Sequence, residues 1–212
     1  SKIEVPKTVI DCGAGPGASI WALPESSLTL IEQDSEFVKL GKKLAPREVE
    51  WKTQSFLRLE ERADLLLFSY SLNEIPKEKL SEAIQKAHTQ TDNFIVVIEP
   101  GTPEGFERIR TIRSELLGLG MYLHAPCPHH HTCPMERADW CHFSVRLSRT
   151  SLHRKLKKGS LGYEDEKYSY LIASKKEHTP SGARVLRNPL KRKGHTIATL
   201  CISEGLVQKT FT

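Results

Sequence analysis

The sequence predicts an α/β protein built on a doubly wound, mostly parallel sheet of the Rossmann type. From residue 8 onward, short apolar segments alternate with longer amphipathic ones, which is typical of strands that alternate with helices. A glycine-rich loop follows the first of these strands, where such sheets bind nucleotide-like ligands. The chain has 212 residues, 38% of them hydrophobic, which is enough for one buried core. We therefore expect a single domain with an appendage.

The expected elements follow the order of a βα repeat. Strands are expected at residues 8–11, 28–32, 49–52, 64–69 and 94–99, and helices at 18–23, 36–44, 77–88 and 103–117. Later strands are expected at 143–148, 168–174 and 196–202. Residues 1–124 then form the Rossmann-like core. Residues 125–142, which are rich in Pro, His and Cys and show no periodicity, form a loop, and residues 143–212 add the remaining core strands and a basic extension of the same domain.

The glycine loop carries the first candidate site. Asp11 ends the first expected strand, and Gly13, Gly15 and Gly17 follow it. Glycines let the backbone approach a ligand closely, while the next helix points its N-terminal N–H groups at that ligand. The pattern also fits the dinucleotide fingerprint, so NAD remains an alternative. We favour S-adenosylmethionine, because Asp11 can meet its cationic amino-acid end and because Pro16 shortens the turn and leaves no special place for a pyrophosphate.

Two further strand ends contribute candidate cofactor residues. Glu32 ends the second expected strand, 21 residues after Asp11, where a carboxylate can accept hydrogen bonds from ribose hydroxyls, and Gln33 follows it. After the fourth strand, Ser69 and Asn73 lie where open α/β sheets place their chemistry. This segment has neither the Asn/Asp-Pro-Pro-aromatic run of amino methylation nor a nucleophilic cysteine, so it identifies no catalytic residue. Asn73 and Glu74 either orient a methyl acceptor or have a helix-capping or core-polar role.

Four of the five cysteines are candidate metal ligands. Cys127, Cys133 and Cys141 follow a C-x5-C-x7-C pattern, and 59 residues separate Cys141 from Cys201. Four thiolates fit one [4Fe–4S] cluster or one tetrahedral zinc ion. We favour the cluster, because the spacings are wider than usual zinc knuckles and a proline follows both Cys127 and Cys133. By spacing alone, nearby histidines are alternative ligands, and the thiols could also be unrelated buried groups. These histidines are His129, His130, His131 and His142.

The charge is distributed unevenly along the chain. Residues 1–149 carry 18 Lys and Arg against 21 Asp and Glu, whereas residues 150–212 carry 13 against 5. A basic segment attached to a near-neutral domain is typical of a protein that binds a polyanion such as RNA, because phosphate contacts release condensed counterions. The alternative is a basic surface that only faces solvent. No apolar run is long enough for a membrane span, so we expect no membrane association.

Several runs of the sequence together resemble the Rsm-type proteins of the small ribosomal subunit, which comprise mitochondrial methyltransferase-like assembly proteins and their bacterial relatives. The resemblance covers nearly the whole chain. It rests on residues 9–17 (VIDCGAGPG), 69–74 (SYSLNE), 99–103 (EPGTP), 127–129 (CPH), 133–134 (CP), 139–143 (DWCHF) and 162–170 (GYEDEKYSY). The cysteine runs and the last run are specific to the family, whereas the first belongs to methyltransferases at large.

The resemblance implies a class I methyltransferase fold and a role on small-subunit ribosomal RNA, or its precursor, during ribosome assembly. It also implies a cluster held by the cysteines at 127, 133, 141 and 201. The expected location is the mitochondrial matrix in a eukaryote or the cytoplasm in a bacterium, and the expected state is a monomer. A non-catalytic assembly factor that binds RNA and retains the fold is the alternative to an active enzyme.

Overall fold

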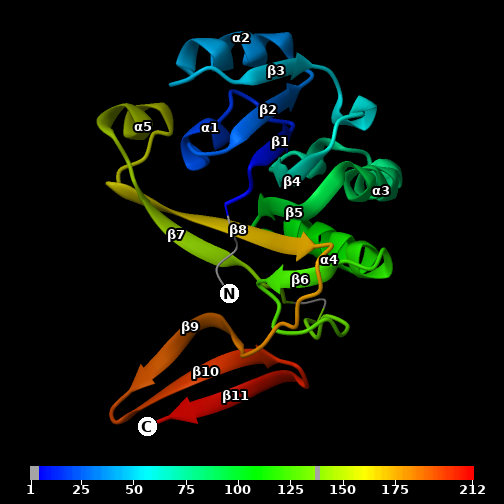
Figure 1. Ribbon diagram of the computed structural model, residues 1–212. Coiled ribbons are helices and arrows are strands. Elements are labelled where there is room, and N and C mark those ends of the chain that lie inside the picture. The colour runs from blue at the N-terminus through cyan, green and yellow to red at the C-terminus, as the bar shows by residue number, and fades with distance from the viewer. Residues whose placement is uncertain (1–4, 137–138) are drawn as a thin grey trace.

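A mixed eight-stranded sheet forms the centre of the computed structural model, which describes residues 5–136 and 139–212. The strand order is β3-β2-β1-β4-β5-β8-β6, and β7 pairs with β8 beside this path (Figure 1). Five strands run parallel: β1 (Thr8–Cys12), β2 (Ser27–Glu32), β3 (Glu50–Thr53), β4 (Ala63–Ser69) and β5 (Thr91–Pro100). The remaining strands are β6 (Tyr122–Ala125), β7 (Phe143–Ser148) and β8 (Tyr163–Ser174), and β8 runs antiparallel to all of its neighbours.

Helices cover both faces of the sheet, which confirms the doubly wound fold. Successive strand residues point to opposite faces, so Val9 packs in one apolar cluster with Ile20 of α1 (Ser19–Ala22), while Ile10 packs in another. The second cluster contains side chains of α3 (Leu80–Gln90) and α4 (Pro103–Gly118). The remaining helix of this group, α2 (Ser35–Leu44), lies against β2 and β3.

Local capping interactions explain where these helices begin. The Asp34 carboxylate accepts a 2.8 Å hydrogen bond from the Glu36 amide at the start of α2, and Thr102 caps α4 in the same way. The helix predicted at residues 77–88 begins instead as a 3-10 turn, η3 (Lys77–Lys79), because the Lys79 amide bonds to the Pro76 carbonyl. Two further 3-10 turns, η1 (Phe56–Arg58) and η2 (Leu72–Glu74), follow β3 and β4.

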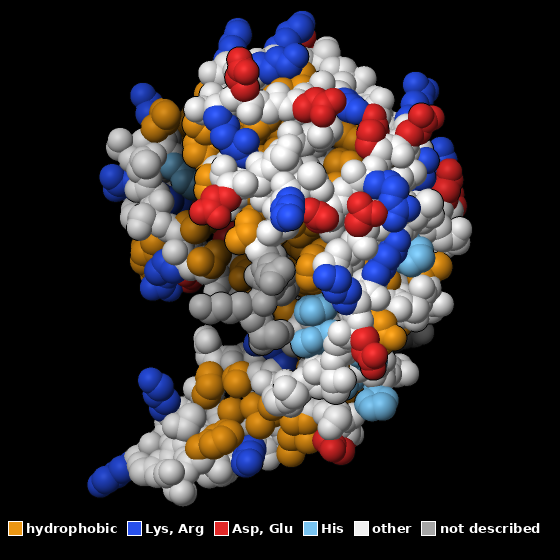
Figure 2. All heavy atoms as spheres, viewed as in Figure 1, with side chains coloured by type: hydrophobic (Ala, Val, Ile, Leu, Met, Phe, Trp, Pro, Cys, Tyr) orange, Lys and Arg blue, Asp and Glu red, His pale blue; other side chains and the backbone are white. Residues whose placement is uncertain are grey.

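The C-terminal residues form a separate antiparallel sheet below the main body (Figure 1). Its strands are β9 (Arg184–Arg192), β10 (His195–Ile202) and β11 (Gly205–Phe211). A recess separates part of this sheet from the body on the face shown in Figure 2. Only β10 was predicted from the sequence, since β9 and β11 are largely exposed and lack the apolar alternation of a half-buried strand. The described residues contain no helix long and apolar enough to cross a membrane.

Candidate functional site

The glycine loop after β1 is shaped by backbone conformations that favour glycine. Gly13, Gly15 and Gly17 have φ angles of 78°, 53° and 84°, in the left-handed region where side chains are strained. A Cβ atom on Gly13 would also lie 2.5 Å from the Cβ of Ser71 in the segment after β4. The loop therefore packs directly against the neighbouring strand end, and its backbone forms the floor of a cavity.

Asp11 provides an uncompensated carboxylate oxygen at this floor. Its side chain is buried, and Oδ2 accepts a 2.5 Å hydrogen bond from the Ser19 hydroxyl, whereas Oδ1 is buried and has no hydrogen-bond partner. Burial raises the pKa of Asp11 to about 6; the Ser19 hydrogen bond opposes this effect and the nearby Glu32 carboxylate adds to it. A buried, unpaired carboxylate oxygen is costly unless a donor or a cation satisfies it.

Glu32 connects the glycine loop to the start of α2. Its Oε2 accepts a 2.9 Å hydrogen bond from the Gly15 amide, and its Oε1 accepts a 2.8 Å bond from the Asp34 amide. Each carboxylate oxygen has a second lone pair, so Glu32 can still accept hydrogen bonds from a ligand. The carboxylate is thereby held in a fixed orientation at the edge of the loop.

These groups line a cavity of about 580 Å³ at the carboxyl ends of β1, β2 and β4. Six residues expected from the sequence border it: Asp11, Gly13, Gly15, Glu32, Gln33 and Ser69. Gly17 and Asn73 do not. Gly17 lies beneath the loop, where a Cβ would approach Ile20, Leu30 and Trp51, and Asn73 is exposed on η2. A smaller cavity of about 230 Å³ adjoins the first and shares Gly13, Glu32, Gln33 and Glu74 with it.

Tyr70 is a cavity residue that the sequence did not reveal. It follows β4 with a φ of 58°, an unusual conformation for an aromatic residue, and its amide donates a 2.8 Å hydrogen bond to the Ile98 carbonyl. Burial raises the pKa of Tyr70, and the neighbouring Glu166 and Tyr168 of β8 raise it further. Backbone strain of this kind is concentrated at functional sites. Ile98 of β5 lines the same cavity and pairs with Tyr170, so β8 lies next to the strand that forms this wall.

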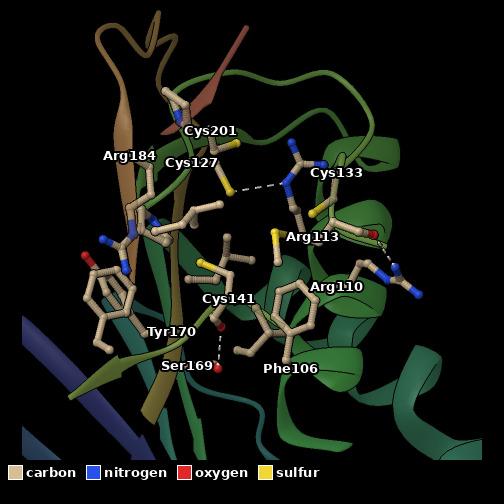
Figure 3. A pocket seen from close by; sticks show the side chains of 17 residues that line it. Phe106, Arg110, Arg113, Cys127, Cys133, Cys141, Ser169, Tyr170, Arg184 and Cys201 are labelled. Atoms are coloured by element: carbon tan, nitrogen blue, oxygen red, sulfur yellow. Dashed lines mark hydrogen bonds between the residues drawn. The ribbon is translucent and has the colours of Figure 1, made fainter. Parts of the chain in front are cut away.

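A second site brings the four candidate metal ligands together. Cys127, Cys133, Cys141 and Cys201 line one cavity of about 40 Å³, and their thiols point into it (Figure 3). Cys127 and Cys133 come from the loop after β6, Cys141 precedes β7, and Cys201 belongs to β10. All four are free thiols, and the other cavity walls include Phe106, Met135 and Leu186. The fifth cysteine, Cys12, is the last residue of β1 and is buried in the core.

Two arginines face these thiols. Arg113 of α4 is buried, lies with its Nε 3.4 Å from the Cys127 sulfur, and donates a 3.0 Å hydrogen bond to the His129 carbonyl. Arg184 of β9 also lines the cavity. Burial raises the pKa of Cys127 and Cys141, and it raises the pKa of Cys201 to about 11. The arginines oppose this effect: both lower the pKa of Cys127, Arg184 lowers that of Cys141, and Arg113 lowers that of Cys201. Within the described ranges, neither guanidinium pairs with a carboxylate.

The four histidines lie outside this cavity. The His129 ring nitrogen Nε2 is 3.6 Å from the Cys201 sulfur, and the His130 Nε2 accepts a 3.0 Å hydrogen bond from the Leu123 amide. In the parts of the chain that the structure describes, no three His, Cys, Asp or Glu side chains are arranged as ligands of a single metal ion.

Comparison with solved structures defines the class of protein to which this fold belongs. The magnesium protoporphyrin IX methyltransferase of Synechocystis PCC 6803, with bound SAH, superimposes with a TM-score of 0.54 at 14% identity, over 79% of this chain and 73% of that one. The precorrin-6y C5,15-methyltransferase of Geobacter metallireducens gives a TM-score of 0.52 at 16% identity, over 80% and 79%. The chain therefore has a class I methyltransferase fold.

The sequence model described as "Mitochondrial small ribosomal subunit Rsm22" matches residues 4–212, and the chain belongs to this family. It is 26% identical to the human "Ribosome assembly protein METTL17, mitochondrial" over 233 residues, which covers 96% of this chain and 50% of the relative. It is 24% identical to the Schizosaccharomyces pombe "Rsm22-cox11 tandem protein 2, mitochondrial" over 267 residues, covering 96% and 35%. The chain thus spans half or less of these relatives, and the resemblance noted in the sequence is confirmed.

Proposed function

We propose that this chain binds S-adenosylmethionine and acts on small-subunit ribosomal RNA, or its precursor, during ribosome assembly. The observation that carries the cofactor assignment is the unpaired Oδ1 of Asp11 at the floor of the 580 Å³ cavity. The cationic ammonium group of S-adenosylmethionine would satisfy this oxygen, and Glu32 would accept hydrogen bonds from the ribose. NAD carries no such cation near its pyrophosphate, which supports the methyl donor over the dinucleotide.

The RNA assignment draws on the relatives and on the charge of the C-terminal region. The human relative is named a ribosome assembly protein, and the family description names the mitochondrial small ribosomal subunit. Exposed Lys191, Arg192 and Lys193 occupy the turn region between β9 and β10, within the segment that carries 13 basic against 5 acidic residues. Such a surface suits phosphate groups.

The expected location is the mitochondrial matrix, or the cytoplasm if the source is bacterial, and the expected state is a monomer.

The donor set at the second site fits a thiolate-bound metal group. Two guanidinium groups beside four thiols would be costly without negative charge, and a cluster with its thiolates supplies that charge. In a tetrahedral zinc site the sulfurs would lie only about 3.8 Å apart, from Zn–S bonds of about 2.3 Å. The wide spacings between the cysteines and the prolines after Cys127 and Cys133 support a [4Fe–4S] cluster, in which each thiolate binds a different iron. The cluster would tie the loop, β7 and β10 together; zinc is the alternative.

The position of Asn73 bears on whether the chain transfers methyl groups. Asn73, one of two residues that could orient an acceptor, is exposed and outside the cavity, which favours a non-catalytic assembly factor as the second candidate function. Tyr70 and Glu74 take its place at the cavity wall. The division into a core at 1–124, a metal loop at 125–142 and a C-terminal part at 143–212 remains our proposal for the domain organisation.

Calorimetry on the full-length protein tests the cofactor assignment. Glu32→Ala should weaken S-adenosylmethionine binding by roughly 10- to 100-fold, since hydrogen bonds to a charged group contribute about 1.5–3 kcal/mol. Glu36→Ala is the matched control, because Glu36 is exposed and, among the residues that the structure describes, its ion pair is with Lys39 alone. Undiminished affinity in Glu32→Ala, or no binding to the wild type, would refute the assignment. Mass spectrometry of small-subunit RNA after incubation then distinguishes an enzyme from a non-catalytic factor.

A further inference from the structure

Strands β7 and β8 extend beyond the carboxyl end of the parallel sheet. Pro100, the last residue of β5, pairs with Tyr168, but β8 begins at Tyr163 and continues its pairing with β7 up to Ser148. The five residues 163–167 span about 17 Å at 3.3–3.4 Å per residue. They form, with β7 and α5 (Ser151–Leu156), an arm of residues 144–167 that projects past the sheet (Figure 1).

The base of this arm adjoins the cofactor cavity. Ile98 of β5 lines the cavity and pairs with Tyr170 of β8, and the arm continues from this pairing past Tyr168. On the other side, the Gly101 amide donates a 2.9 Å hydrogen bond to the Lys167 carbonyl. Because ligands and acceptors of open α/β sheets bind beyond the carboxyl ends of the strands, the arm projects on the side from which an acceptor must approach.

The tip of the arm carries excess positive charge. Residues 150–162 contain four basic residues and no acidic residue. Two of the three acidic residues of the arm are neutralised within it, since Glu164 pairs with Arg149 at 2.8 Å and with Lys157 at 3.1 Å, and Asp165 pairs with Arg146 at 2.7 Å. The third, Glu166, lies at the base of the arm, away from the tip. Three exposed cations at the tip have no carboxylate partner in the described ranges: Arg154, Lys155 and Lys158.

We propose that this arm holds the RNA strand that crosses the cofactor cavity, with its tip on phosphates that flank the acceptor nucleotide. The proposal rests on RNA being the partner and adds where the RNA lies. An arm of about 17 Å is long enough to reach phosphates a few nucleotides from the cavity. The positive charge of the tip favours RNA as the bound partner. A protein bound to the exposed leucines of α5, Leu152 and Leu156, would be a different outcome.

Site-specific photocrosslinking on the full-length protein and a small-subunit ribosomal RNA transcript tests this placement. A photoreactive amino acid replaces Leu156 at the arm tip, Phe37 at the cofactor cavity, or Leu190 on β9, all of which are exposed. Crosslinks from positions 156 and 37 should map within about ten nucleotides of each other. If position 190 captures RNA but position 156 captures none, or captures protein, the arm is not the RNA surface. If no position captures RNA, the proposed partner itself is wrong.

Charge reversal provides a quantitative test with a matched control. The variant with Arg154→Glu, Lys155→Glu and Lys158→Glu should bind the transcript at least about tenfold more weakly and lower the salt slope by about 2–3, since each phosphate contact contributes roughly 0.7–0.9 to that slope. The control carries the same change of charge at exposed Lys42, Lys43 and Lys176, away from the arm. S-adenosylmethionine affinity should be equal in both variants. Equal RNA affinity in the two variants would overturn the proposal.

Discussion

The indole nitrogen of Trp140 donates a 2.9 Å hydrogen bond to the carbonyl oxygen of Gly101. Trp140 precedes Cys141 of the thiol cavity, and Gly101 follows β5 at the edge that carries the cofactor cavity. The Gly101 amide in turn bonds to Lys167 of β8, and Ser169, two residues further on, donates a 2.9 Å bond to the Cys141 carbonyl. The loop that carries the proposed metal ligands and the edge of the proposed cofactor site are therefore held together through β8.

Gly101→Ala should destabilise the protein because there is no room for a methyl group. A Cβ at this position would lie 2.6 Å from the Lys167 carbonyl carbon and from the Tyr168 amide nitrogen, both backbone atoms. We expect the free energy of unfolding to fall by about 1–3 kcal/mol, as is typical of overpacking. Gly118→Ala is the control, since nothing lies within 4 Å of its Cβ, and alanine at this helical position should be neutral or slightly stabilising. Chemical denaturation measures the stability of both variants. Equal losses of stability would contradict the close packing of Gly101 against the backbone of β8.

Asp11→Asn should make the ligand-free protein more stable at neutral pH. The pKa of Asp11 in the folded chain is about 6, above its value of about 3.8 when unfolded. Between these pH values the folded state holds more protons, so the free energy of unfolding falls as the pH rises through the window, by up to about 3 kcal/mol at roughly 1.4 kcal/mol per pH unit. Asparagine cannot ionise, so the variant should lack this loss, whereas Asp92→Asn at an exposed ion pair should retain it.

The same variant should bind S-adenosylmethionine poorly, since the cation loses its carboxylate. In the wild type, affinity should fall about tenfold per pH unit below pH 6 as Asp11 becomes protonated. Denaturation between pH 4 and pH 8, together with calorimetry over the same range, measures both effects. An Asp11→Asn protein that is less stable than the wild type at pH 7, or that binds the cofactor equally well, would show that this carboxylate does not serve the ligand.

Sequence patterns predicted the parts of the molecule that bury a regular apolar face. Val9 and Ile10 alternate between two buried clusters, and this kind of alternation made the parallel strands predictable. The strain at Tyr70 left no such signal, because a positive φ at a tyrosine arises from tertiary packing. β9 was missed since its charged, exposed residues resemble a loop, and Asn73 was assigned to the site although η2 turns it toward solvent.

The turn region between β9 and β10 should contribute to RNA binding through phosphate contacts. Lys191, Arg192 and Lys193 are exposed, and none pairs with a carboxylate in the described part of the chain. Replacing all three with Glu should lower the salt slope of RNA binding by about 2–3, because fewer counterions are then released. The Lys42, Lys43 and Lys176 variant is again the control. Filter binding between about 50 and 200 mM salt measures the slope, and an unchanged slope would place the phosphate contacts elsewhere.

If the four thiols hold the proposed metal group, Cys201→Ser should remove that group and loosen the C-terminal sheet. Cys201 is the only one of the four cavity thiols that β10 supplies, so its loss leaves three ligands from a single irregular stretch. A metal bond offsets the entropy of closing the segments between its ligands, and the variant should therefore lose most of its bound metal together with thermal stability. Cys12→Ser is the control: Cys12 is fully buried in the core, so this variant should lose stability but keep its metal content per folded chain.

Iron, sulfide and zinc analysis, together with the visible absorption spectrum of anaerobically purified protein, identifies the metal group. Iron and sulfide in equal amounts indicate the cluster, and zinc alone indicates the alternative. If Cys201→Ser retains both the metal content and the melting temperature of the wild type, Cys201 is not a ligand.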